Sequence, residues 1–265
     1  MHYHTLELTL TLTPAAKVAT VTLNRPELRN AFNAASIAEL THVFDALGRE
    51  PNVRAIVLAA NGSAFCAGGD LNWMKTMAGY SDAENLADAT LLANMLRTIY
   101  LCPKPVLAKV QGDCYAGGMG LVAACDVVVA AEQAHFCLSE VKLGLIPATI
   151  APYVIKAMGE QAARRYFLTA ERFSASEALR IGFVHEVVDS TALDARVDAI
   201  VKALVLNSPN AASQAKLLVR EFAGQPVSDA LVADSASRIA TIRASHEGRE
   251  GVASFLEKRS PSWQD

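Results

Sequence analysis

The sequence predicts an α/β fold of parallel βαβ units, followed by a region made only of helices. Short apolar runs alternate with helical periods over the first 190 residues, the order typical of βαβ units. The run Ala55–Ala60 is apolar throughout, which favours a strand covered on both faces. We therefore predict an α/β core over residues 1–190 and a C-terminal helical region over 191–265. That region either folds back on the core or packs on another copy of the chain.

The predicted elements follow in chain order. Alternating leucines from Leu6 to Leu12, a turn at residues 14–16 and the run Val18–Leu23 predict a hairpin. Further strands are expected at 55–60, 106–110, 126–131, 134–138 and 183–188. Helices are expected at 34–48, 71–76, 82–100, from 119 onward, at 147–159, at 160–169 and in a short segment opened by a capping box at Ser174 and Glu177. The C-terminal helices are expected at 193–206, 209–223, 227–245 and 250–258.

Composition narrows the class of protein. Apolar residues make up 52% and charged residues 19% of the chain, as in a globular domain. A net charge of −3 gives no basic surface for nucleic acid or an anionic membrane. The five cysteines lack C-x-x-C spacing, no basic and apolar leader opens the chain, and no histidine has metal-ligand spacing. We expect a cytoplasmic protein with reduced thiols and no metal.

Two turns share one pattern, a strand and a breaker followed by small residues. Ala67-Gly68-Gly69 follows the strand at 55–60, and Ala116-Gly117-Gly118 follows the strand at 106–110. A turn that opens a helix leaves backbone N–H groups without intrahelical acceptors. One N–H from each turn can converge on a carbonyl oxygen and stabilise an oxyanion or enolate. For each turn taken alone, close packing of helix on strand is the competing interpretation.

Glu140 is the candidate for proton transfer. It follows the β segment that comes just after the second turn. To act as both acid and base, its carboxylate needs a raised pKa. A solvated or ion-paired loop acid is the alternative for Glu140 considered alone.

A dinucleotide fingerprint also matches part of this stretch. Gly118-x-Gly120-x-x-Ala123 follows a strand, and Glu140 comes twenty residues after Gly120. In that fold the acid should end the next strand, whereas Glu140 lies beyond it. The fingerprint also leaves the Ala67 turn unexplained, so we set it aside. No G-x-S-x-G elbow of a serine hydrolase is present.

Four segments carry a resemblance to a known family. They are LNRPELRNAFN (23–33), AFCAGGDL (64–71), VQGDCYAGGMGLVAACD (110–126) and LSEVKLGLIP (138–147), and the closing EGVASFLEKRSPSW (250–263) adds to them. In order and spacing the chain resembles the enoyl-CoA hydratase/isomerase (crotonase) superfamily. The resemblance implies a spiral of βαβ units with a helical trimerisation region, a homotrimer or dimer of trimers, an acyl-CoA substrate and no metal or redox cofactor.

The resemblance also implies roles for single residues. It places the oxyanion-hole N–H groups on Ala67 and Gly117 and the catalytic carboxylate on Glu140. The residues that it places along the acyl-CoA site are Gly68, Gly69, Asp70, Leu71 and Gly120 beside the turns, Leu28, Arg29 and Ala31 near the CoA adenine, and Phe255 and Lys258, which close over CoA and often come from a neighbouring copy.

The chain departs from the family at Gly120, where typical hydratases carry a second catalytic glutamate. Family members with one carboxylate include double-bond isomerases, some decarboxylases and hydratases of branched substrates. We expect Gly120 to leave empty volume near the acyl chain. The run LSEVKLGLIPATIAPYV resembles bacterial hydratases of methylglutaconyl-CoA and carboxygeranoyl-type thioesters, which serve leucine and isoprenoid catabolism. A distal carboxylate on such a substrate needs a cation, for which Lys75 is the candidate and a solvated helix lysine the alternative.

We therefore predict an enoyl-CoA hydratase for a branched 2-enoyl-CoA, carboxylated ones included. A Δ3,Δ2-enoyl-CoA isomerase and a non-catalytic acyl-CoA-binding relative are the alternatives.

Overall fold

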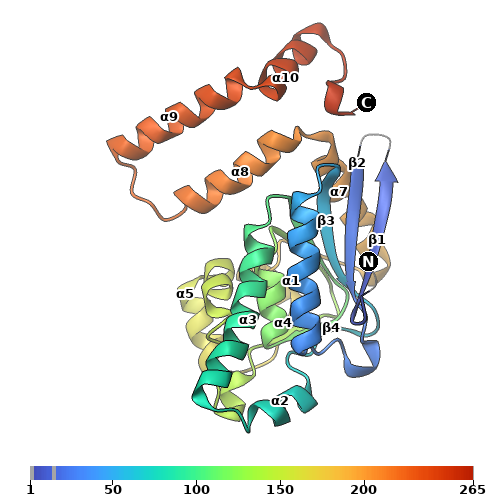
Figure 1. Cartoon of the computed structure of the whole chain (residues 1–265), viewed down its shortest axis with the longest axis vertical. Coiled ribbons are helices and arrows are strands. Elements are labelled where there is room, and N and C mark those ends of the chain that lie inside the picture. The colour runs from blue at the N-terminus through green and yellow to red at the C-terminus, as the bar shows by residue number, and fades with distance from the viewer. Residues whose placement is uncertain (1–2, 14–15, 265) are drawn as a thin grey trace.

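The core contains two sheets through which the chain spirals. The structure is a computed structural model that describes residues 3–13 and 16–264 (Figure 1), so positions 14 and 15 of the predicted hairpin turn lie outside it. The first sheet has the strand order β1-β2-β3-β5-β7-β10. Only β1 and β2 pair antiparallel, and the other neighbours run parallel. Its strands are β1 (Leu6–Thr13), β2 (Ala16–Leu23), β3 (Val53–Ala60), β5 (Val106–Val110), β7 (Val127–Ala131) and β10 (Glu186–Val188).

The second sheet is built from short strands in the order β4-β6-β8-β9. They are β4 (Ala64–Cys66), β6 (Asp113–Tyr115), β8 (His135–Cys137) and β9 (Phe173–Ser174). After each of β3, β5 and β7 the chain crosses to this sheet, which confirms the spiral. Of these strands only β8 was predicted, as part of the longer run 134–138, because two or three residues alone leave no periodic pattern.

The helices lie at the predicted positions and differ from the prediction only at their ends. They are α1 (Ala34–Arg49), α2 (Leu71–Met77), α3 (Asp82–Leu101), α4 (Gly117–Ala123), α5 (Ala151–Thr169) and α6 (Ala175–Arg180). The predicted division at Gly159 is present, since this residue breaks α5 with a φ of 79°. The helix expected from Pro147 begins only at Ala151. The strand expected from Phe183 begins only at Glu186, because the N–H groups of Phe183 and Val184 both donate to the carbonyl of Ala178.

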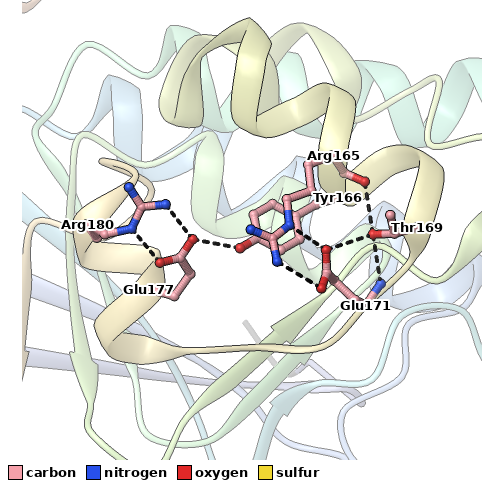
Figure 2. A network of polar contacts seen from close by, with 6 residues as sticks. All are labelled: Arg165, Tyr166, Thr169, Glu171, Glu177 and Arg180. Carbon is pink, nitrogen blue, oxygen red and sulfur yellow. Dashed lines mark hydrogen bonds and ion pairs between the residues drawn. The ribbon is translucent and has the colours of Figure 1, made fainter.

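A polar network joins the second half of α5 to α6 (Figure 2). The buried Tyr166 donates its hydroxyl to Glu177 at 2.7 Å. Arg180 also binds Glu177, and the hydrogen bonds from these two residues lower the pKa of the Glu177 carboxyl to about 2. Only half of the predicted capping box forms. Ser174 Oγ accepts from the N–H of Glu177 at 3.2 Å, while the carboxylate of Glu177 is used by Arg180 and Tyr166.

The C-terminal helices behave in two ways. The first, α7 (Leu193–Leu206), packs on the first sheet, where Leu193, Val197 and Val205 are buried against β3, β5 and β7. The others, α8 (Pro209–Phe222), α9 (Asp229–Ala244) and α10 (His246–Glu257), extend from one end of the core (Figure 1). Many of their apolar side chains are exposed, including Leu218, Val219, Ile239, Phe255 and Leu256.

Polar contacts join the arm formed by helices α8, α9 and α10 to the core. Arg54 of β3 donates to the carbonyls of Val205 and Trp263 at 3.1 and 3.3 Å. Lys216 of α8 pairs with Asp126 at 2.6 Å, and its amine is mostly buried. The chain is thus bonded to the core at Val205 before α8, at Lys216 within α8 and at Trp263 after α10.

Candidate active site

The ends of three parallel strands bring the predicted site residues together. In the second sheet Cys66 of β4 pairs with Cys114 of β6, and Tyr115 of β6 pairs with Cys137 of β8. The carboxyl ends of parallel strands lie at one edge of a sheet, where ligands bind in many α/β folds. The first turn leaves β4 at this edge, the second leaves β6, and Glu140 follows β8.

The two turns lie in direct contact. A Cβ atom on Gly68 would lie 3.0 Å from the Cβ of Ala116, and one on Gly118 would lie 2.8 Å from the Cβ and carbonyl oxygen of Cys66. Gly68 also has a φ of +93°, which favours glycine. Close packing therefore explains Gly68 and Gly118. Close packing does not explain the N–H groups of the neighbouring residues Gly69 and Gly117.

The donor in the first turn is Gly69, a correction to the prediction of Ala67. The Ala67 N–H donates to the carbonyl of Arg29 at 3.0 Å and is not available. A parallel bridge forms around Gly69, with Phe32 N–H donating to Gly68 and Asp70 N–H donating to Phe32. The middle residue of such a bridge points its own N–H away from the partner. The Gly69 N–H has no acceptor among the described residues.

The donor in the second turn is Gly117, the first residue of α4. Its N–H lacks an intrahelical acceptor by position and has no other acceptor within residues 3–13 and 16–264. The preceding Ala116 is strained, with φ 47° and ψ −124°, a type of outlier that clusters at functional sites. A Cβ on Gly117 would lie 2.4 Å from Cζ of Phe32.

Phe32 thus links the two turns, although the sequence did not single it out. Its backbone binds the first turn on both sides of Gly69, and its ring contacts the second turn at Gly117. The side chain is 3% exposed. The available signal was a lone aromatic residue between two asparagines in the 23–33 segment, which does not distinguish this role from ordinary core packing.

Glu140 has the environment of a proton-transfer group. It opens a 3₁₀ turn, Glu140–Leu143, shortly after β8. Its Oε2 atom is buried and has no hydrogen-bond partner in the described part of the chain. Burial raises the pKa of this carboxyl above its ordinary value. Buried polar atoms without a partner are rare in folded proteins, and perturbed carboxyls are frequent at functional sites.

Gly120 does not leave empty volume, so that prediction is wrong. A Cβ on Gly120 would lie 2.3 Å from Cγ2 of Ile150, and both residues are buried. The side chain of Ile150 fills the space.

Asp70 also differs from its predicted role along the acyl-CoA site. Its carboxylate pairs with Arg25 at 2.7 Å and caps α2 by accepting from the N–H groups of Asn72 and Trp73. Burial alone would raise the pKa of Asp70, but these hydrogen bonds outweigh it and lower the pKa. Arg25 also donates to the carbonyl of Ala31 at 2.6 Å. The pair therefore fastens the 23–33 segment to the first turn, and Asp70 is only 5% exposed.

Replacing Arg25 with methionine is expected to destabilise the protein. The Asp70 carboxylate would be left buried without its cation, at a cost of about 3 kcal/mol, or roughly 6–12 °C in Tm. The lowered pKa of Asp70 means that the pair stabilises at neutral pH and that this contribution is lost as pH falls through the folded-state pKa. The Tm difference from wild type should therefore narrow in acid.

The control for this prediction is Arg49→Met. The Arg49 pair with Asp45 is exposed, at 79% and 48% of the two side chains, and such pairs contribute little. Equal Tm losses in the two variants would contradict the role of the Arg25 pair.

The residues predicted to bind CoA lie in two places, one at the 23–33 segment and the start of α2, the other at the end of α10. Leu28 and Arg29 are exposed on the 23–33 segment, and Leu71 is 75% exposed at the start of α2. The side chain of Ala31 is buried. Lys75 is exposed on α2 and forms no ion pair with another described residue. Phe255 and Lys258 lie at the end of α10, at the opposite end of the molecule from α2 (Figure 1). One chain therefore does not bring them to the strand ends.

Among residues 3–13 and 16–264 there is no group of three or more histidine, cysteine, aspartate or glutamate side chains placed to hold a metal ion. Over residues 3–13 and 16–264, no helix combines the length and the apolar character that crossing a membrane requires.

Comparisons with known proteins agree with this architecture. Residues 13–265 match the model of the enoyl-CoA hydratase/isomerase family. A crystal structure of an enoyl-CoA hydratase from Shewanella pealeana superposes with a TM-score of 0.92 at 43% identity, covering 99% of this chain and 96% of that one.

Two curated relatives align with nearly the whole chain. The mevalonyl-coenzyme A hydratase sidH of Aspergillus fumigatus is 33% identical, over 95% of this chain and 93% of its own length. The short-chain-enoyl-CoA hydratase of Clostridium acetobutylicum is 30% identical, over 92% of each. The chain belongs to the enoyl-CoA hydratase/isomerase family and has its crotonase fold.

Proposed function

We propose that the protein is an enoyl-CoA hydratase that adds water across the 2,3 double bond of a branched enoyl-CoA. One observation carries this proposal: Glu140, whose buried Oε2 atom has no hydrogen-bond partner among the described residues, follows the strand next to two turns that each present an N–H without an acceptor there. A hole for a developing oxyanion and a group that moves a proton are the two requirements for chemistry next to a thioester carbonyl.

In the proposed reaction the thioester oxygen lies between the N–H groups of Gly69 and Gly117. The oxygen of a water molecule bonds to C3 while Glu140 takes a proton from it. The electron pair of the double bond moves through C2 onto the thioester oxygen. Each N–H stabilises this enolate, and loss of one such donor typically costs ~2.7–4 kcal/mol. When the enolate collapses, C2 takes the proton from Glu140, which returns to its ionised form.

The substrate class is inferred from two likenesses. The run from Leu138 to Val154 resembles hydratases of methylglutaconyl-type thioesters. The relative from Aspergillus fumigatus is named for mevalonyl-coenzyme A, whose acyl chain is branched at C3. For a carboxylated acyl chain, Lys75 is the proposed cation.

The proposal needs only a CoA thioester and water, with no further cofactor. In it the protein is cytoplasmic and assembles as a homotrimer or dimer of trimers. Phe255 and Lys258 of a neighbouring copy then close over CoA beside Leu28 and Arg29. This arrangement accounts for the distance between α10 and α2 within one chain (Figure 1).

A Δ3,Δ2-enoyl-CoA isomerase is the second candidate, because a single carboxylate suffices to move a proton between C2 and C4. Assays of purified protein with linear 2-enoyl-CoA, 3-methyl-branched 2-enoyl-CoA, 3-methylglutaconyl-CoA and 3-enoyl-CoA separate the two. We expect water addition to the 2-enoyl thioesters, with the highest kcat/KM for a branched one. Consumption of 3-enoyl-CoA alone would establish the isomerase, and tight CoA binding without any turnover would contradict both.

A further inference from the structure

The contact between Gly120 and Ile150 is the tightest side-chain obstruction around α4. A Cβ on Gly120 would lie 2.3 Å from Cγ2 and 2.8 Å from Cβ of Ile150, and 3.4 Å from Cδ2 of Leu96. Real Cβ atoms do not approach other atoms closer than 3.0 Å. Ile150 and Leu96 are at most 1% exposed, so neither side chain can swing into solvent.

The backbone of Ile150 is fixed as well. Its carbonyl oxygen accepts from the N–H groups of Tyr153 and Val154, both at 3.0 Å, at the start of α5. Rotation of the side chain about χ1 would move Cγ2, but it would leave the 2.8 Å conflict with Cβ in place. Isoleucine is also stiff at χ1 because it is branched at Cβ. Any side chain at position 120 therefore has to displace the start of α5.

Position 120 lies beside the catalytic groups. Gly117, which supplies one N–H of the proposed hole, comes three residues earlier on the same helix, and residues three apart lie on one side of a helix. A side chain at 120 would therefore begin one helical turn from the Gly117 N–H of the proposed hole. The space that its stem needs is occupied by the apolar side chain of Ile150.

We infer that Ile150 is a mechanism-determining residue that excludes a second acid and leaves Glu140 as the single proton carrier. This inference rests on the proposed function. The proton that Glu140 takes from water is then the one delivered to C2, so H and OH add to the same face of the double bond. Positions 120 and 150 together determine the number of catalytic acids, with glycine at 120 and the β-branched isoleucine at 150.

The first test measures this steric coupling without using activity. In the wild-type background Gly120→Ala overpacks the contact and should lower Tm by roughly 3–10 °C. In an Ile150→Gly background the same change should leave Tm unchanged or raise it, because alanine then fills part of a cavity and favours helix more than glycine does. Glycine is acceptable at a helix N-cap, which is the position of Ile150.

The matched control is Gly79→Ala. A Cβ on Gly79 meets only the carbonyl oxygen of Thr76, at 3.6 Å, so Tm should hardly change in either background. If Gly120→Ala lowered Tm equally in both backgrounds, the assignment of Ile150 would be wrong, whatever the protein catalyses.

The second test uses the pH profile of hydration. In wild type, kcat/KM should fall on the acid side through one ionisation, that of Glu140, with no matching fall from a second carboxyl at higher pH. In Gly120→Glu/Ile150→Gly, a second carboxyl beside the substrate should add an alkaline limb, because a general acid must be protonated. A profile for wild type that already shows two carboxyl ionisations, or a double variant with the wild-type profile, would overturn the inference.

Discussion

Replacing Glu140 with glutamine is expected to lower kcat by about 10²–10⁴-fold. Glutamine keeps the size of the side chain but neither accepts a proton from water nor returns one to C2. KM should change little, because the two N–H groups that hold the thioester oxygen remain. Steady-state hydration of a branched 2-enoyl-CoA measures both constants.

The same substitution should not weaken the fold. Burial raises the pKa of Glu140, so ionisation of this carboxyl costs stability in the folded state. Its favourable contribution is complete below the unfolded-state pKa and is lost as pH rises through the folded-state pKa. Glu140→Gln should therefore unfold at the same or a higher temperature than wild type at neutral pH, and this advantage should vanish in acid.

The control for Glu140→Gln is Glu132→Gln, which changes an exposed acid directly after β7. It should alter neither kcat nor Tm. If Glu140→Gln retained full hydratase activity, the proposed mechanism would fail. A lower Tm at neutral pH would instead show that the carboxylate stabilises the fold.

Gly117→Ala is expected to lower kcat by about 10²–10³-fold, as loss of an oxyanion-hole donor does elsewhere. The added Cβ would lie 2.4 Å from Cζ of Phe32, so either the ring or the turn has to move. Phe32 also holds the first turn by backbone hydrogen bonds on both sides of Gly69. One methyl group should therefore displace both donors.

This loss should appear in kcat more than in KM, since the N–H groups bind the enolate more strongly than the ground-state carbonyl. Gly79→Ala again provides the control, because its Cβ meets no close neighbour. A Gly117→Ala variant with wild-type kcat would show that this N–H does not contact the reacting oxygen.

The sequence predicted the long elements and the place of the site because both depend on local patterns. Alternation and helical periods located the strands of the first sheet and the helices, and the repeated small-residue turns marked two of the three strand ends. The second sheet was largely missed, because its strands are only two or three residues long. Such strands are stabilised by pairing across the spiral and not by their own composition.

The misassigned details all depend on contacts between distant segments. The N–H of Ala67 donates to the carbonyl of Arg29, so Ala67 is not the donor of the first turn. The bridge to Phe32 leaves the N–H of Gly69 without an acceptor among the described residues. The space at Gly120 is closed by Ile150, thirty residues further along the chain. Asp70 is turned inward by Arg25. None of these partners can be read from spacing, because each is set by how the turns of the spiral stack.

The most direct test of the proposed hole and of Glu140 is proton exchange at C2 of a saturated acyl-CoA in ²H₂O, followed by mass spectrometry. A saturated thioester has no double bond to hydrate, so exchange reports only the enolate hole and the carboxylate. Wild-type protein is expected to introduce deuterium at C2, and Glu140→Gln and Gly117→Ala are each expected to reduce the rate at least about 10²-fold. Exchange by Glu140→Gln at the wild-type rate would contradict the proposed role of Glu140.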